Sequence, residues 1–308
     1  MLAWRPALSR RVHVTWKNRD GTTKEEFHKA AAAVEAVPSR DGRLIMLAQP
    51  DYLMSRANFV IFDRSRGTIA PFTSPDTTST SPVWSPDSQR VVYSSLRDGA
   101  FDLYLKEPRP GGADSLLLHT NGMKAAQSWS PDGKTILYNA VDPQTRLDLW
   151  AIEARSGATP RVFAGGEADQ CCGRFSPDGK WVAFVSNQSG RAEVFVMPSG
   201  GGAEPMRVSN DGGGEPDWNT AGGELFFISP TNRLMSVRFT VASGTFTAAS
   251  PVPLFPINAR RKPAVQLNVS GDRTYAPLAD GFVVTEKDTD PRAGTINILV
   301  NWTAPKTR

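Results

Sequence analysis

The sequence predicts an all-β fold, a six-bladed β-propeller of four-stranded antiparallel blades, and three observations support this prediction. A twelve-residue phrase occurs three times, as WSPDSQRVVYSS, WSPDGKTILYNA and FSPDGKWVAFVS. The copies recur at a nearly constant interval. Short β-branched and aromatic runs follow each copy, separated by connectors rich in Gly, Pro and Asp, which is the pattern of strands joined by hairpins.

The interval can be measured on the aromatic residue that opens each phrase or its weaker equivalent. These residues are Trp84, Trp129, Phe175 and Trp218. They stand 45, 46 and 43 residues apart, and fainter copies of the turn at 41–42 and 280–281 bring the units to six. In most units three β-rich runs follow the turn, and a fourth run leads into the next turn. Four strands at this period are typical of a propeller blade.

The two ends of the chain are expected to meet in one blade. Only FHKAAAAVEAV, from Phe27, looks helical, which argues against a helical solenoid, and a closed ring leaves no exposed sheet edges. The last unit has strand candidates up to NILVNW, at 297–302, but too little chain follows for a good outer strand. Residues 11–30 are therefore expected to close the ring. We expect one propeller domain over 1–308, with clear repeats over about 37–302.

The phrase has the composition of a structural corner. Its aromatic residue can wedge between neighbouring sheets, and its proline ends a strand because it fixes φ and cannot donate to a ladder. The aspartate can accept hydrogen bonds from nearby backbone N–H groups, while Gly133 and Gly179 supply positive φ. Ser88 stands at this position in one copy, so the turn tolerates an ordinary residue. A ring of metal ligands is the alternative role for Asp87, Asp132 and Asp178.

These phrases resemble the WD-repeat-like blades of the TolB-type β-propeller family, most strongly over 82–229. More narrowly, VSNDGGGEPDWNTAGGELFFIS and INILVNW are similar to propellers appended to bacterial serine/threonine kinases, where they serve as sensor domains. The resemblance implies a six-bladed binding platform and a periplasmic or extracytoplasmic location. Typical TolB also has an amino-terminal α/β domain and an export signal, and this sequence shows neither. In DWNTAGGE, Thr220 and Ala221 stand where the family has Pro and Asp.

Composition narrows the partners and cofactors. A formal charge of +4, spread along the chain, is too diffuse for a nucleic-acid protein. Neither a signal peptide nor a stretch apolar enough for membrane insertion is present. The three histidines have no metal-ligand spacing, and no metal or cofactor is expected. Cys171 and Cys172 are expected to be two buried thiols, because neighbouring side chains of a strand point to opposite faces.

The sequence predicts a non-enzymatic scaffold that binds a protein, a peptide or another ligand. It contains no Gly-x-Ser-x-Gly elbow, no phosphate-binding loop and no kinase catalytic motif. One alternative is a propeller lyase or glycosidase with its site over the central channel, and another is the detached sensor domain of a receptor kinase. The candidate ligand-binding residues, at the rim or channel, are Arg174, Asp211, Glu215 and Asp217. The sequence does not determine the ligand, the binding face or the oligomeric state.

Overall fold

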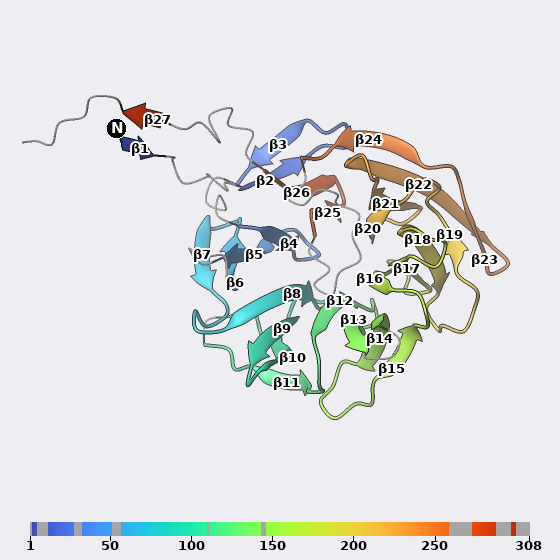
Figure 1. Cartoon of the computed structure of the whole chain (residues 1–308), viewed down its shortest axis with the longest axis horizontal. Helices are drawn as coiled ribbons and strands as arrows, with labels where there is room; N and C mark the ends of the chain where they lie inside the picture. Colours follow the sequence, from blue (N-terminus) through green and yellow to red (C-terminus); the bar gives the residue numbers. More distant parts are fainter. Residues whose placement is uncertain are drawn as a thin grey trace, which may run out of the picture.

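The computed structural model of the chain describes residues 2–4, 12–27, 33–50, 57–109, 111–142, 146–258, 273–287 and 297–299. The described residues contain no helix. Figure 1 shows six antiparallel sheets arranged radially about a common centre. The prediction of a six-bladed β-propeller is therefore confirmed.

Blades 1 to 4 each consist of four consecutive strands. Blade 1 contains β4 (Glu35–Pro38), β5 (Leu44–Pro50), β6 (Ala57–Asp63) and β7 (Thr68–Pro71). Blade 2 contains β8 (Thr78–Trp84), β9 (Val91–Arg97), β10 (Ala100–Lys106) and β11 (Ser115–Leu118). Blade 3 contains β12 (Lys124–Trp129), β13 (Thr135–Asp142), β14 (Arg146–Glu153) and β15 (Arg161–Ala164). Blade 4 contains β16 (Gln170–Phe175), β17 (Trp181–Ser186), β18 (Glu193–Pro198) and β19 (Met206–Arg207).

Blades 5 and 6 depart from this regular plan. Blade 5 contains β20 (Gly214–Trp218), β21 (Glu224–Ile228), β22 (Arg233–Ala242), β23 (Thr245–Ala248) and β24 (Val252–Pro256). Its long strand β22 pairs with β24 along its first half and with β23 along its second. Blade 6 has the order β25 (Tyr275–Leu278), β26 (Gly281–Lys287), β2 (Val12–Lys17) and β3 (Thr23–Glu26). Strands from near both ends of the chain thus share one sheet, and the predicted amino-terminal closure is confirmed.

Two expectations about the ends of the repeat were wrong. Asn297–Leu299 forms β27, which pairs with β1 (Leu2–Trp4) rather than with the last blade, so the amino-terminal segment supplies two strands of blade 6. Part of the helical-looking run from Phe27 is the strand β4. Its first three residues are buried and it pairs with β5, so sheet pairing and burial determine the structure of residues 35–37. Residues 28–32 of that run lie outside the described residues.

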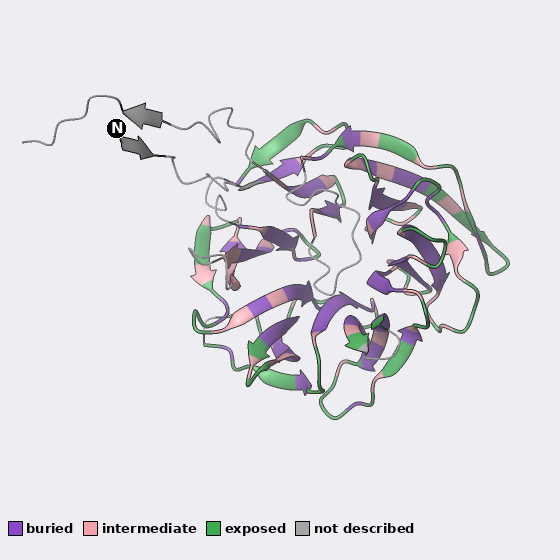
Figure 2. Cartoon of the chain, viewed as in Figure 1, coloured by how far each residue is buried: buried purple, intermediate pink, exposed green. Residues whose placement is uncertain are grey.

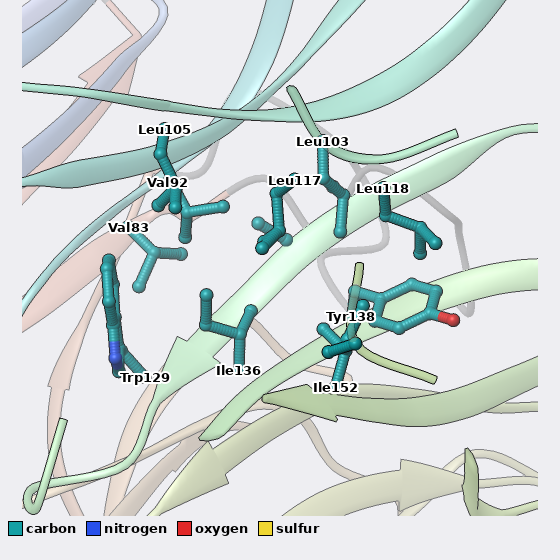
Figure 3. Close-up of a cluster of buried hydrophobic side chains, with 12 residues drawn as sticks. Val83, Val92, Leu103, Leu105, Leu117, Leu118, Trp129, Ile136, Tyr138 and Ile152 are labelled. Atoms are coloured by element: carbon teal, nitrogen blue, oxygen red, sulfur yellow. The ribbon is translucent and has the colours of Figure 1, made fainter. Parts of the chain in front are cut away.

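The core is divided among the joints between neighbouring blades. Each of the six joints has its own hydrophobic cluster, drawn from the facing sides of two sheets. Figure 3 shows the joint of blades 2 and 3, where Val92 and Leu105 meet Trp129 and Ile136. A middle strand such as β17 is buried on both faces, which explains its unbroken apolar run WVAFV. Figure 2 shows that outer strands such as β3 and β7 are, by contrast, largely exposed.

The aromatic residues of the phrase act as the predicted wedges. Trp84 of blade 2 donates from Nε1 to the carbonyl of Val37 in blade 1, at 2.9 Å. Trp218 of blade 5 makes the same bond to Arg174 of blade 4, also at 2.9 Å. Trp129 instead donates within its own turn, but its ring packs into the cluster shared with blade 2. The indole thus fills the joint, and in two blades it is also held there by a hydrogen bond to the preceding inner strand.

The turn aspartates have the predicted structural role. In blade 3, Asp132 Oδ1 accepts from the Ser130 hydroxyl at 2.6 Å and from the Lys134 N–H at 3.0 Å. The same Ser130 oxygen accepts from the Thr135 N–H, so one serine closes the turn on both sides. The Ser130 hydroxyl is the main cause that lowers the pKa of Asp132 below its ordinary value of 3.8. Asp41, Asp87 and Asp178 repeat this arrangement in blades 1, 2 and 4.

Substitutions at the fourth position of the turn should change stability in opposite directions. Ser88 has φ +58° and Gly133 has φ +74°. This left-handed region is unfavourable for every residue except glycine. Ser88→Gly should therefore raise the free energy of unfolding by about 1 kcal/mol. The matched change Gly133→Ser should lower it by a similar amount, because a Cβ there meets nothing within 4 Å and only the backbone conformation is penalised. Denaturant titration measures both, and a loss of stability in Ser88→Gly would contradict this assignment of the turn.

Closure of the ring can be tested at Gly281, where β26 begins. A Cβ at this residue would overlap the carbonyl oxygen of Lys17 in β2, and φ is +152°. Gly281→Ala should therefore cost roughly 3 kcal/mol or more, since it separates the carboxyl-terminal and amino-terminal strands of blade 6. Gly99→Ala is the control: φ there is +85°, but a Cβ meets nothing within 4 Å. Equal losses in the two variants, measured by thermal and denaturant unfolding, would contradict the closure.

Candidate functional site

The inner strands of the six blades end around one pocket, which we call the axial pocket. Its volume is about 190 Å³, and its walls come from the ends of β4, β8, β12, β16, β20 and β25 and from the turns that follow several of them. Among the described residues the charged side chains in its lining are Arg40, Arg174, Asp217 and Arg273. Prolines and indoles of the repeated turns supply much of the remaining wall. The corners that join the blades therefore also build the mouth of a positively charged cavity.

Several inner strands are bulged just before they reach the pocket. β8, β16 and β20 each shift register against the next strand of their blade, and the bulges contain Ser81, Cys172 and Glu215. These three residues have φ values of +57°, +64° and +51°. β12 shifts register at Gln127. A bulge changes which side of the strand a residue faces, so simple alternation does not place the side chains that surround the axis.

Arg174 is the most deeply buried cation of the pocket lining. Its side chain comes from β16, its residue is 5% exposed, and Nη1 donates to the carbonyls of Gln127 and Gly173. Its Nε has no hydrogen-bond partner among the residues that the structure describes. Burial, and secondarily the charge of Arg273, lowers the pKa of Arg174 to about 10, so the guanidinium remains charged at neutral pH.

The carboxylates near the axis hold blades 5 and 6 together. Asp217 Oδ2 lies 3.3 Å from Nη1 of Arg273, and Nη2 of Arg273 also donates to the Gln127 carbonyl of blade 3. Glu215 accepts from the backbone N–H of Thr274 at 2.7 Å and from its hydroxyl at 2.9 Å. We call Gln127, Arg174, Glu215, Asp217, Arg273 and Thr274 the axial network. It joins four blades through polar contacts around the centre.

The structure brings together three of the four residues predicted for a site. Arg174 and Asp217 line the axial pocket, and Glu215 belongs to the axial network beside it. Asp211 does not line the pocket: its side chain is 98% exposed and lies 3.7 Å from Nη2 of Arg191. Sequence reasoning missed Arg273 and Arg40. Arg40 could have been found, because the alignment of PSRDG with WSPDS puts it in the place of Pro86.

Neither the buried nor the turn carboxylates form an ion site in the part of the chain that the structure describes. No group of three or more His, Cys, Asp or Glu side chains there could hold a metal ion. The buried Glu193 accepts from Gly212 N–H at 2.9 Å and from the Ser209 hydroxyl, so it pins the connector to the next blade. In the same described ranges, no helix has the length and apolar character needed to cross a membrane.

The comparisons with known proteins agree with this architecture. The family model for the PD40 TolB beta propeller domain matches residues 40–251, and the chain belongs to this family. A structure assigned to TolB from Agrobacterium tumefaciens superposes with a TM-score of 0.65 at 18% identity, over 90% of this chain and 98% of that one. This likeness concerns the fold.

Two curated relatives match shorter stretches. An uncharacterized peptidase, YuxL, of Bacillus subtilis is 29% identical over a 167-residue alignment that covers 42% of this chain and 25% of the relative. The Tol-Pal system protein TolB of Ruthia magnifica subsp. Calyptogena magnifica is 27% identical over 82 residues, which are 27% of this chain and 19% of that protein. The chain thus matches a quarter or less of the length of these two proteins.

Glu215 should behave as a joint between blades. Glu215→Ala should lower the free energy of unfolding by about 2–4 kcal/mol, because it removes two hydrogen bonds to a carboxylate. Alanine and glutamate both carry a Cβ and are equally strained at φ +51°, so the difference in stability between the two reports the loss of the carboxylate. The exposed Glu204, in the same part of the chain, provides the control, and its alanine variant should stay within about 0.5 kcal/mol of wild type. Indistinguishable denaturation curves for the two variants would contradict the joint.

Proposed function

We propose that this chain is a binding scaffold and that its axial pocket receives a carboxylate-bearing segment of a protein or peptide partner. The observation on which this depends is the lining itself: three arginines and one aspartate supply its charge. A guanidinium presents planar, paired donors that match a carboxylate, so this lining suits an Asp or Glu side chain or a chain end. Membership of the TolB propeller family supports a role in binding at this general level.

The size of the pocket favours part of a chain over a whole small molecule. Its volume of about 190 Å³ is below the roughly 300–1,000 Å³ that is usual for small-molecule sites. One or two side chains of a longer partner can enter, while the rest lies over the proline and indole rim. Connector loops on a rigid scaffold are a common place for such recognition.

The enzyme alternative is less well supported by the geometry. An enzyme with its site over the channel needs converging acids there, and the main candidates are Glu215 and Asp217, with Arg174 nearby. Both acids are committed to the axial network, Glu215 to Thr274 and Asp217 to Arg273. The Bacillus subtilis relative is named a peptidase, but the match covers a quarter of it.

We also propose an extracytoplasmic location, which the likeness to TolB proteins supports.

The proposal predicts which substitutions weaken peptide binding. A phage-displayed random peptide library selected on the wild-type chain should enrich sequences with Asp or Glu. The selected peptides should bind Arg174→Met at least about tenfold more weakly, because a charge-assisted pair is lost. Thr220→Trp, which fills the pocket at its rim, should have a similar effect without removing a buried charge. Arg66→Met is the control, since its side chain is 77% exposed and Arg66 does not line the pocket.

Calorimetry with synthetic copies of the selected peptides measures these affinities, and circular dichroism checks that each variant is folded. Peptides that bind Thr220→Trp as tightly as wild type would contradict the pocket as the site. Steady turnover of a selected peptide, abolished by Asp217→Asn, would instead support the enzyme alternative.

A further inference from the structure

Cys171 and Cys172 are adjacent residues of β16 whose sulfur atoms lie against each other. Both cysteines are buried, and the two Sγ atoms are 2.6 Å apart. The sequence predicted two buried thiols, which the structure confirms. It also predicted side chains on opposite faces, and this part was wrong because the strand is not regular at this point.

The contact is a consequence of the bulge in β16. Cys171 pairs with Val185 and Arg174 with Ala183, so two residues, Cys172 and Gly173, lie opposite one on β17. Cys172 has φ +64°. The corresponding bulges of β8 and β20 contain Ser81 and Glu215, also with positive φ, and neither has sulfur. The unusual backbone is therefore a property of the inner strands of this propeller and does not depend on the thiols.

We propose that Cys171 and Cys172 form a redox site, which closes to a disulfide between neighbours by exchange with a low-molecular-weight disulfide. A disulfide between neighbouring residues closes no long loop, so it hardly lowers the conformational entropy of the unfolded chain and stabilises the fold little in that way. In an ordinary chain it is opposed by strained geometry. Here the fold already holds Cys172 in an unusual conformation and keeps the sulfurs in contact, so folding should favour the bond.

The exchange balances without any further reactant. Cys172, which is 5% exposed while Cys171 is 0% exposed, is the first nucleophile. Its thiolate attacks one sulfur of the external disulfide and releases the other half as a thiolate, which takes up the proton. The Cys171 thiolate then attacks Sγ of Cys172 and expels the second half as a thiol. The external disulfide is reduced to two thiols and the cysteine pair is oxidised to one disulfide.

The bond would brace the segment that carries Arg174. Gly173 lies between the cysteines and Arg174, and a Cβ at Gly173 would lie 2.6 Å from Leu149 of blade 3. The bulge is therefore packed tightly against its neighbour. Oxidation would fix this bulge, two residues from the guanidinium that lines the axial pocket.

The test compares the folded chain with the same chain denatured. Both are equilibrated with mixtures of reduced and oxidised glutathione, starting from the reduced and from the oxidised protein so that slow exchange is detected. Free thiols are then alkylated under denaturing conditions. Trypsin releases residues 162–174, which contain both cysteines, and mass spectrometry identifies the disulfide within this peptide by the loss of two hydrogens.

The folded chain should favour the disulfide at least about tenfold more than the denatured chain, which corresponds to a reduction potential lower by about 30 mV. Cys171→Ser and Cys172→Ser, which each leave one thiol, should give no bond within the peptide. An equilibrium constant in the folded chain equal to or below that of the denatured chain would overturn the proposal. So would oxidation that yields only glutathione adducts or linked dimers.

Discussion

The packing of one blade's aromatic residue against the inner strand of the preceding blade is the contact on which the rest of the structure depends. A four-stranded sheet that is apolar on both faces cannot bury them alone, so each blade needs two neighbours. Trp84 and Trp218 make this contact specific, because their indole N–H groups bond to the preceding inner strand. The same need for a neighbour explains why amino-terminal strands complete blade 6 and so close the joint to blade 1.

The repeated corner also determines where a ligand can bind. Its serine and aspartate satisfy the backbone of the turn, while its proline and its indole, which fills the joint between blades, also line the axial pocket. The charged residues of the pocket do not belong to the repeated phrase. Arg40 stands in blade 1 where the phrase has proline, and Arg174 comes directly before the phrase in blade 4. A structural motif thus frames the pocket, while the few positions outside the motif give it a chemical character.

The fold could be predicted from the sequence because most blades repeat the same local chemistry at a nearly constant interval. Arg174 and Asp217 could be placed near the axis, since both precede a corner. Arg273 could not, because its partner Asp217 is 56 residues away and the repeat is faint in the last unit. The bulges were also missed: alternation assumes a regular strand, and positive φ at Cys172 or Glu215 leaves no signature in residue type.

The most direct test of the central claim is a crystal structure of this chain with a selected acidic peptide. We predict six sheets around one axis, closed by residues 12–26, with a peptide carboxylate within hydrogen-bonding distance of Arg174 or Arg273 in the axial pocket. A peptide bound along an outer strand, with the pocket filled only by solvent, would contradict it. Sheets that do not enclose a common centre would contradict the whole architecture.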